Sequence, residues 1–250
     1  MRDPRTSFEP VAASYLHSAV HSDAEALEHM VQVVRPSGGV VVDVATGAGH
    51  TAYTFAPYVD RVIATDITES MLKVTRKTAR ERGISNRDEV FALAEALPFR
   101  TSALTGVTCR MGAHHFDDVA KFVGEAARTI KPGGWFLLVD TVGADDDAAD
   151  AEVDHLERVR DPSHRRNFRP FEWKRFAEEA GFTVEHMDER WKAIDTEDWM
   201  VRMRVSDEDR AHLRDVIAGA KGKFAEYLHT TEIDGKQHFH LRELLMLARK

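Results

Sequence analysis

The sequence of 250 residues contains very little cysteine and no long apolar segment. Its single cysteine, Cys109, excludes an internal disulfide and any cluster of cysteine ligands, as is usual in a reducing compartment. We interpret Cys109 as a small buried residue rather than a nucleophile. No apolar run has the length needed to cross a bilayer, and the charged start MRDPRTSFEP lacks the apolar core of a signal peptide. We therefore expect a cytoplasmic protein without a membrane span.

Basic charge and metal-binding motifs are also scarce. The chain has 34 Lys and Arg against 42 Asp and Glu, a net charge of −8, and no lysine-rich tail. Tight non-specific binding of nucleic acid requires neutralisation of phosphates, so we expect a small-molecule partner and no nucleic acid. Neither an H-E-x-x-H motif nor paired cysteines occur, and the 13 histidines are scattered, so we expect no metal.

Apolar runs alternate with longer helical patterns along the first 140 residues. The runs are GVVVDV, RVIATD, EVFALA, GVTCRM and GWFLLVD. Alternation of strands and helices predicts parallel βαβ units, and runs that are apolar throughout are typical of strands covered on both faces. The sequence therefore predicts the α/β class with a doubly wound, mostly parallel sheet.

Helical material is expected on both sides of this alternation. Apolar residues with helical spacing follow Asp23 and, later, Pro170, which predicts a helix before the first strand and another that ends before Gly181. A strand-like FTVEHMDERW comes next, then a helical pattern over about 196–236, and finally the apolar ELLMLAR. The chain thus carries a helical insertion before its last strand.

The turn after the first strand, in VVDVATGAGHTA, predicts a nucleotide-binding site. Gly47 and Gly49 permit positive φ and close approach of a ligand to the helix N-terminus. Asp66 ends the second strand about 20 residues later, where a carboxylate can accept hydrogen bonds from a ribose. A tight turn without a ligand is the alternative. GAGHTA also matches a loose nicotinamide-cofactor pattern, but Asp43 would oppose a pyrophosphate and favours a cation such as S-adenosylmethionine (SAM).

Five ordered motifs, VVDVATGAG, VIATDITESML, AEALPF, CRMGAHHF and IKPGGWFLLVD, resemble those of class I SAM-dependent methyltransferases. The resemblance is strongest to the ubiquinone and menaquinone C-methyltransferases and covers about residues 8–141. It implies a Rossmann-like sheet of seven strands whose last strand is antiparallel, with SAM across the ends of the first, second and fourth strands. It also implies an enzyme that moves a methyl group from SAM to a small organic acceptor.

The resemblance assigns cofactor contacts to residues of these motifs. Asp43, Gly47 and Gly49 would hold the methionine part of SAM and Asp66 the ribose, while Ile67 and Met71 would pack on the adenine. The remaining expected contacts are Tyr15, Ala45, Ala94, Glu95 and Arg110. Arg110 as a residue that binds the acceptor, and Ile67 and Met71 as ordinary core, are the alternatives.

Three residues depart from the pattern of the resembled family. Ala45 replaces a glycine, as in several quinone methyltransferases. Leu93 and Thr105 stand where the family often has acidic residues, which predicts a looser cofactor pocket. A second hypothesis follows from these two residues, namely a SAM-fold protein with non-methylating chemistry or without turnover. A nicotinamide-dependent oxidoreductase is the third.

Histidines supply the candidate bases for an acceptor that must lose a proton. His114 and His115 follow the fourth strand, and His164 lies in RVRDPSHRRNFRPFEW. Histidine is suited to this role because its reference pKa is about 6.5. His114 is the first choice, while His115 as a helix cap or packing residue is the alternative.

The same segment and the helical insertion raise the question of partners. Arg165, Arg166 and Arg169 could clamp an anionic acceptor, or could pair with surface aspartates. EDWMVRMRV and KFAEYL, in the insertion, could roof the pocket or form a homodimer contact. We predict one domain with an N-terminal helical lid (1–36), a SAM-binding core (37–141), a substrate-facing insertion (142–181) and C-terminal strands (182–250).

Overall fold

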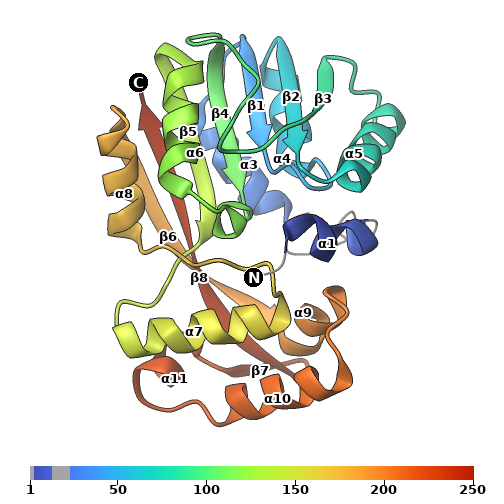
Figure 1. Cartoon of the computed structure of the whole chain (residues 1–250), viewed down its shortest axis with the longest axis vertical. Helices are drawn as coiled ribbons and strands as arrows, with labels where there is room; N and C mark the ends of the chain where they lie inside the picture. Colours follow the sequence, from blue (N-terminus) through green and yellow to red (C-terminus); the bar gives the residue numbers. More distant parts are fainter. Residues whose placement is uncertain (1–2, 13–22) are drawn as a thin grey trace.

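A central sheet of eight strands dominates the computed structural model, which describes residues 3–12 and 23–250 (Figure 1). Seven strands follow the order β3-β2-β1-β4-β5-β8-β6, and β7 pairs with β8 off this path. The strands are β1 (Val40–Val44), β2 (Arg61–Asp66), β3 (Arg87–Phe91), β4 (Leu104–Arg110), β5 (Ile130–Thr141), β6 (Thr183–Asp195), β7 (Thr231–Ile233) and β8 (Lys236–Arg249).

Strand direction confirms the predicted class. Strands β1 to β5 pair in parallel, and β8 runs antiparallel to both of its long neighbours, β5 and β6. The order reverses at β1, so the carboxyl ends of β1, β2 and β4 meet at a topological switch point, where ligands bind in open α/β sheets. The fold therefore places the glycine turn after β1 at the expected ligand position.

Helices and short 3-10 turns connect the strands. The helices are α1 (Pro4–Phe8), α3 (Ala24–Val34), α4 (His50–Phe55), α5 (Glu69–Glu81), α6 (Val119–Thr129), α7 (Asp147–Arg160), α8 (Pro170–Glu179), α9 (Thr196–Arg202), α10 (Asp207–Ala218) and α11 (Gly222–Leu228). The 3-10 turns are η1 (Glu9–Val11), η2 (Ala56–Tyr58) and η3 (Ala113–His115). Asp23 caps α3 by accepting a hydrogen bond from the amide of Ala26, and Pro170 begins α8, as the sequence predicted.

Two apolar cores cover the two faces of the sheet. One contains Phe122 of α6 and Trp173 of α8, and the other contains Met30 of α3 and Phe55 of α4. All four side chains are almost fully buried, and each contributes about 1.5–3 kcal/mol by leaving water. These helices hold the strands, and so the strand ends, in fixed positions.

A second lobe lies below the sheet, where α7, α9, α10 and α11 pack around the extended ends of β6 and β8 (Figure 1). Its core buries Trp199, Met200, Phe224 and Tyr227, which belong to the two segments proposed as a roof or a dimer contact. Because these side chains pack inside the lobe, they are not a surface for a second copy. The homodimer stays a prediction without an assigned surface.

The end of the insertion differs from the predicted helical pattern. The last helix stops at Leu228, and β7 and β8 form a hairpin. Asp234 and Gly235 connect them, both with positive φ (52° and 72°), as a two-residue type I′ turn requires. Asp-Gly is the preferred pair for that turn, so this local signal overrides the apolar spacing. Among the described helices, none is long and apolar enough to cross a membrane.

Candidate active site

The turn between β1 and α4 exposes backbone to a cleft. Ala45, Gly47 and Gly49 all have positive φ (54°, 54° and 88°). A Cβ atom added at Gly47 would meet nothing within 4 Å, whereas one at Gly49 would lie 2.5 Å from the ring of Tyr53. Gly47 therefore leaves the backbone open to a ligand, and Gly49 allows the helix to pack against its own tyrosine.

Asp66 holds this turn from the end of β2. One of its carboxylate oxygens accepts a hydrogen bond from the amide of Gly47 at 3.0 Å, and the other accepts from the amide of Thr68 at 2.8 Å. Burial raises the pKa of Asp66, and these amide donors oppose that change. The carboxylate lines the cleft beside the open backbone of Gly47.

Asp43 lies behind the turn. Its carboxylate is 1% exposed and accepts hydrogen bonds from the hydroxyls of Thr46 at 2.6 Å and Thr108 at 2.7 Å. Burial raises the pKa of Asp43 to about 6, although both hydroxyls favour its charged form. Asp43 thus fixes Thr46, which does line the cleft, and is itself outside the cleft wall.

The cleft that the open turn borders is connected to solvent. Its lining comes from the ends of β1, β2 and β4 and from α1: Phe8, Ala45, Thr46, Gly47, Ala48, His50, Thr51, Asp66, Ile67, Thr68, Met71, Arg110, Met111, Gly112, His115 and Phe116. Val11 and Ala12 pack with Ala48 and Met71, so the described part of the N-terminal segment covers this cleft.

A second cavity adjoins the cleft and shares Phe8, Met111 and His115 with it. Its other walls come from η3, β5, α7, the segment before α8, β6, α9 and β8: His114, Thr141, Glu157, Arg160, Asn167, Ile194, Trp199, Arg202 and Leu241. It lies between the sheet and the second lobe and carries charged groups that the cofactor motifs do not supply.

His114 forms a buried pair with Asp140 at the edge of this second cavity. The Nδ1 atom of His114 is 2.6 Å from a carboxylate oxygen of Asp140, whose other oxygen accepts from the amide of His114 at 3.1 Å. Burial alone would lower the pKa of His114, but the charge and hydrogen bond of Asp140 outweigh it and raise that pKa. The carboxylate sets the tautomer, because Nδ1 carries the proton and Nε2 is left to accept one.

Two more histidines surround this pair. The ring centroids of His114 and His115 are 4.2 Å apart, and His164 is 5.5 Å from His114. Burial and the neighbouring histidines lower the pKa of His115 well below its usual value, so it is neutral at pH 7. His164 is 1% exposed, lies 3.2 Å from Asp154 and lines neither cavity. The structure brings all three predicted bases together but places only His114 and His115 on a cavity wall.

Comparison with known proteins identifies the family. A model described as methyltransferase domain matches residues 42–138. An uncharacterized methyltransferase of Bacillus subtilis (strain 168), YcgJ, is 41% identical over 170 residues, which are 68% of this chain and 67% of that protein. The crystal structure of a putative methyltransferase from Bacillus halodurans has a TM-score of 0.85 at 38% identity and covers 90% of this chain and 98% of that one.

The chain belongs to this methyltransferase family. It transfers methyl groups from SAM, as the motifs predicted. The ubiquinone/menaquinone C-methyltransferase UbiE of Francisella philomiragia is 35% identical over 107 residues, 41% of this chain and 43% of that protein. The likeness to the quinone C-methyltransferase thus covers less than half of either chain.

The residues of the methyltransferase's cleft fit SAM. The backbone of Gly47 is open to the cleft, and no Cβ fills the space beside the buried carboxylate of Asp66. Ile67, Met71 and Phe116 supply apolar surface for a base. When bound, SAM supplies an electrophilic methyl group on a sulfonium. Asp66 and Arg110 supply one negative and one positive charge to this lining.

The predicted cofactor residues fall into three groups. Ala45, Gly47, Asp66, Ile67, Met71 and Arg110 line the cleft. Asp43, Gly49, Ala94 and Glu95 do not line it. Ala94 is packed in the core, and a carboxylate oxygen of Glu95 accepts from the amides of Asp117 and Asp118 before α6. Tyr15 is outside the described residues.

The predicted arginine clamp faces away from both cavities. Arg165 pairs with Asp117 at 2.7 Å, Arg166 with Glu172 at 3.0 Å, and Arg169 with Asp147 at 2.7 Å. None of the three arginines lines either cavity. Each arginine forms an ion pair with a carboxylate that lies close to it in the fold, so the structure favours surface ion pairing over the binding of an anionic acceptor. Arg160 and Arg202 line the second cavity instead.

Leu93 and Thr105, which stand where the resembled family often has acidic residues, both lie outside the lining of the cofactor cleft. Thr105 lies at the start of β4 and packs on Gly39, where an added Cβ would be 2.0 Å from the threonine hydroxyl. That end of β4 is opposite to the cleft. Leu93 is 54% exposed and lies outside the cleft lining. Neither residue loosens the wall of the cofactor cleft.

Several wall residues escaped the sequence analysis. Phe8 and Met111 line both cavities, and Met111 has a φ of 55° that no sequence motif announces. Arg160, Trp199 and Arg202 come from helices that only the tertiary fold brings to the site. Signals existed for Arg160, which lies in the basic segment after the fifth strand, and for Trp199 and Arg202, which lie in EDWMVRMRV, a segment that could roof the pocket.

Proposed function

We propose that this methyltransferase acts on a small organic acceptor held in the second cavity, and that His114 takes the acceptor's proton. The acceptor would carry a hydroxyl, a thiol or an acidic carbon. The observation that supports this is the 2.6 Å contact between His114 and Asp140 on a cavity that adjoins the cofactor cleft. An amine without a proton to lose would not require such a pair.

The proposed reaction is a direct displacement. A bond forms between the acceptor and the methyl carbon as the bond from carbon to sulfur breaks, and the sulfur leaves as a neutral thioether. The proton of the acceptor passes to the Nε2 atom of His114, which becomes an imidazolium that Asp140 stabilises. The walls shared by the two cavities, Phe8, Met111 and His115, keep acceptor and cofactor in line, and such positioning supplies up to about 7–11 kcal/mol.

Arg160 and Arg202 support an acceptor with an anionic group. The Nε atom of Arg160 donates to the carbonyl of Trp199 at 3.0 Å, and its guanidinium lies 4.9 Å from the centroid of that ring. Arg202 pairs with Asp198 at 2.8 Å and has a side chain only 7% exposed. Both guanidiniums are therefore held in place before an acceptor arrives, which reduces the entropy cost of binding.

The two halves of the chain would divide the work. SAM would contact Gly47, Asp66 and Met71, and the carboxylate of Asp66 would bind its ribose. Asp43 would not touch SAM and would act by holding Thr46 in place. The insertion at 142–181 and the helices within 196–236 would bind the acceptor. This proposal keeps the predicted division of the chain and moves the anion contact from Arg165, Arg166 and Arg169 to Arg160 and Arg202.

The test uses isotopically labelled SAM and fractionated metabolite extract. The wild-type protein should label at least one acceptor that carries an ionisable oxygen, sulfur or carbon. His114→Gln should lose about 10²–10⁴-fold in turnover, because general base catalysis contributes that much. Its affinity for SAM, measured by calorimetry, should stay within about twofold, because His114 does not line the cleft.

Two results would overturn the proposal. One is label found only on amines, with none on oxygen, sulfur or carbon. The other is a His114→Gln variant whose turnover equals that of the wild-type protein. Glu152→Gln is a matched control: this carboxylate lies on α7 and lines neither cavity, so its turnover should not change.

A further inference from the structure

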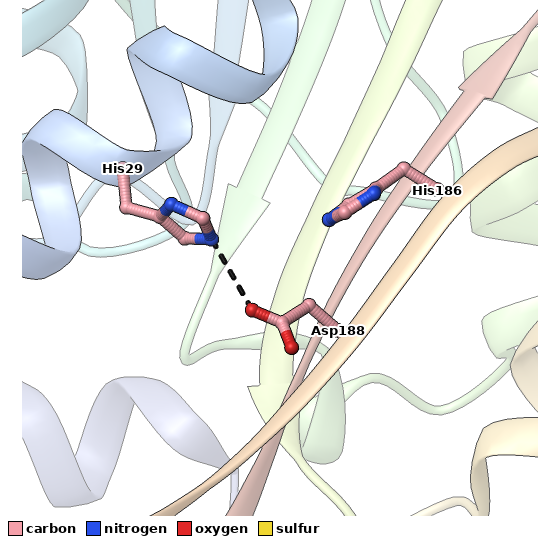
Figure 2. A group of neighbouring side chains, drawn as sticks. All are labelled: His29, His186 and Asp188. Carbon is pink, nitrogen blue, oxygen red and sulfur yellow. Dashed lines mark hydrogen bonds and ion pairs between the residues drawn. The ribbon is translucent and has the colours of Figure 1, made fainter.

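Two histidines and an aspartate meet on the surface away from both cavities described above. His29 lies on α3, and His186 and Asp188 lie on β6 (Figure 2). One potential ligand atom from each residue lies within 4.8 Å of the other two. None of the three lines the cofactor cleft or the second cavity. His29 and Asp188 instead line a separate pocket, which shares Arg110 with the cofactor cleft.

The geometry of β6 explains how two of these side chains face the same way. His186 and Asp188 are two positions apart, and alternate residues of a strand point to one face. The pairing of β6 with β8 shifts register between Val184 and His186, a bulge that redirects the side chains that follow it. Helix α3 covers this face of the sheet and brings His29 opposite them.

His186 carries a nitrogen in need of a partner. Its Nε2 atom is buried and makes no hydrogen bond within residues 3–12 and 23–250. Figure 2 shows one nitrogen of this ring directed toward the space between His29 and Asp188. A buried polar atom without a partner destabilises the fold, and a cation in that space would give this nitrogen a partner.

The spacing of the other two ligand atoms suits one ion. The Nε2 atom of His29 is 3.3 Å from a carboxylate oxygen of Asp188. Two ligands of a tetrahedral ion at about 2.1 Å are separated by about 3.4 Å. The side chains of His29 and Asp188 are 41% and 49% exposed, so they can move the remaining distance toward His186 and admit a water as fourth ligand.

We propose that His29, His186 and Asp188 form a binding site for one divalent transition-metal ion, for which Zn²⁺ is the probe. Two imidazoles and one carboxylate are the ligand set that zinc takes in many proteins, with a fourth position open to water. The ion would join α3 to β6, two elements that no sequence motif connects. Its role is to hold the helix that covers one face of the sheet.

The positive charges near the cluster are Arg190 and the buried Arg110, which line the pocket beside His29 and Asp188 and have Glu243 and Asp23 as acidic neighbours. Arg190 is the basic residue of β6 that follows Asp188 on the same face, and it would repel a cation. Its guanidinium, however, lies 2.5 Å from a carboxylate oxygen of Glu243 and 3.7 Å from one of Asp23. The positive charge of Arg190 is thus balanced within the fold, and Asp188 remains to pair with the ion.

The experiment titrates the whole, untagged chain with Zn²⁺ by calorimetry and repeats the titration with Co²⁺, whose visible absorption reports coordination number. We expect one ion per chain and a Co²⁺ spectrum of four or five ligands. His29→Ala and Asp188→Asn should each weaken binding at least about tenfold. Asp188→Asn keeps the shape of the side chain, so it remains informative should His29→Ala fail to fold.

The control is His238→Ala, which removes a histidine from β8 at a distance from the cluster. It should leave Zn²⁺ affinity unchanged. Excess Zn²⁺ should raise the Tm of the wild-type chain by at least about 4 °C, and not that of Asp188→Asn. Three results would overturn the proposal. They are binding of fewer than one ion per chain, equal Zn²⁺ affinity in Asp188→Asn and the wild-type protein, and a loss of Zn²⁺ affinity in His238→Ala as large as that in Asp188→Asn. The test needs no turnover, so its outcome is separate from that of the methyl acceptor.

Discussion

The cofactor cleft and the second cavity adjoin each other, yet they are built in opposite ways. Apart from Phe8, the cleft is lined by three short stretches within 45–51, 66–71 and 110–116, each of which follows a strand end. The second cavity takes its walls from positions between Phe8 and Leu241. The match to the methyltransferase domain ends at residue 138, before Thr141, the first wall residue beyond η3. The walls of the cofactor cleft are therefore local in the chain, whereas the walls of the proposed acceptor cavity are brought together by tertiary packing.

The largest loss of turnover should come from Asp140→Asn, because this mutation changes the proposed acceptor site and leaves the cofactor cleft unchanged. Three donors converge on this carboxylate: the amides of His114 and Thr141 and the Nδ1–H of His114. In Asp140→Asn the side-chain NH₂ group, itself a donor, would point at one of these donors, so that hydrogen bond would be lost. The negative charge that raises the pKa of His114 would also be lost. We expect kcat to fall about a thousandfold in a labelled-methyl assay.

A calorimetric titration of Asp140→Asn with SAM is the control for that prediction. The affinity should stay near the wild-type value, because Asp140 is not a wall residue of the cleft. An unchanged kcat would show that the histidine pair takes no part in catalysis, and a lost SAM affinity would show that the two halves are not separable.

Asp66→Ala should produce the reverse pattern. The mutation removes the acceptor of the Gly47 amide and the carboxylate that faces the cofactor, so SAM affinity should fall roughly 10–100-fold by calorimetry. Asp88→Ala, on the neighbouring strand and paired with Arg61, removes the same atoms outside the cleft and should change nothing. Equal affinity in the two variants would contradict our view of the cleft.

The pH dependence of turnover should distinguish the base from the cofactor site. Because the pKa of His114 is raised above 6.5, the neutral base forms only above that pH, and kcat should rise about tenfold per pH unit below it. The contribution of His114 to the free energy of unfolding should change with pH in the opposite direction to kcat. A raised folded-state pKa adds stability below 6.5 that is lost as the pH increases through the folded value. A flat acidic limb of kcat would exclude His114.

The smallest effect should come from Arg160→Ala. If the acceptor is anionic, its KM should rise about tenfold with little change in kcat, because one charged hydrogen bond is lost. Arg166→Ala provides the matched control, since Arg166 pairs with Glu172 outside both cavities. A steady-state comparison with the labelled acceptor checks both. A KM that is equal in the two variants would argue for a neutral acceptor.

Sequence reasoning succeeded where one short stretch carries the whole signal. The glycine turn, Asp66 and the helices α3 and α8 needed only spacing, caps and apolar periodicity, and the structure has each in the expected place. Asp43 was predicted to hold the methionine part of SAM, and no sequence pattern shows that its carboxylate accepts hydrogen bonds from the hydroxyls of Thr46 and Thr108. The Asp234–Gly235 hairpin was a local signal that apolar spacing concealed.

Sequence reasoning failed where contacts join distant segments. His114 and Asp140 are 26 positions apart, and His29 and Asp188 are 159 apart. The acidic partners of Arg165, Arg166 and Arg169 could not be assigned, because they lie 48, 6 and 22 positions away along the chain. Such pairings depend on which faces the helices present after packing, and a single sequence does not encode those faces in any short window.

Strand β8 has a consequence for how the chain assembles. It follows every other described element in sequence, yet it lies between β5 and β6 in the sheet and also pairs with β7 in the second lobe (Figure 1). During synthesis, strands β1 to β5 can collapse into a cofactor-binding half. The second lobe cannot form at that stage, and β5 and β6 each keep an unpaired edge until β8 has been made. Nascent chains that lack β8 should therefore be the species most exposed to aggregation and to chaperone capture.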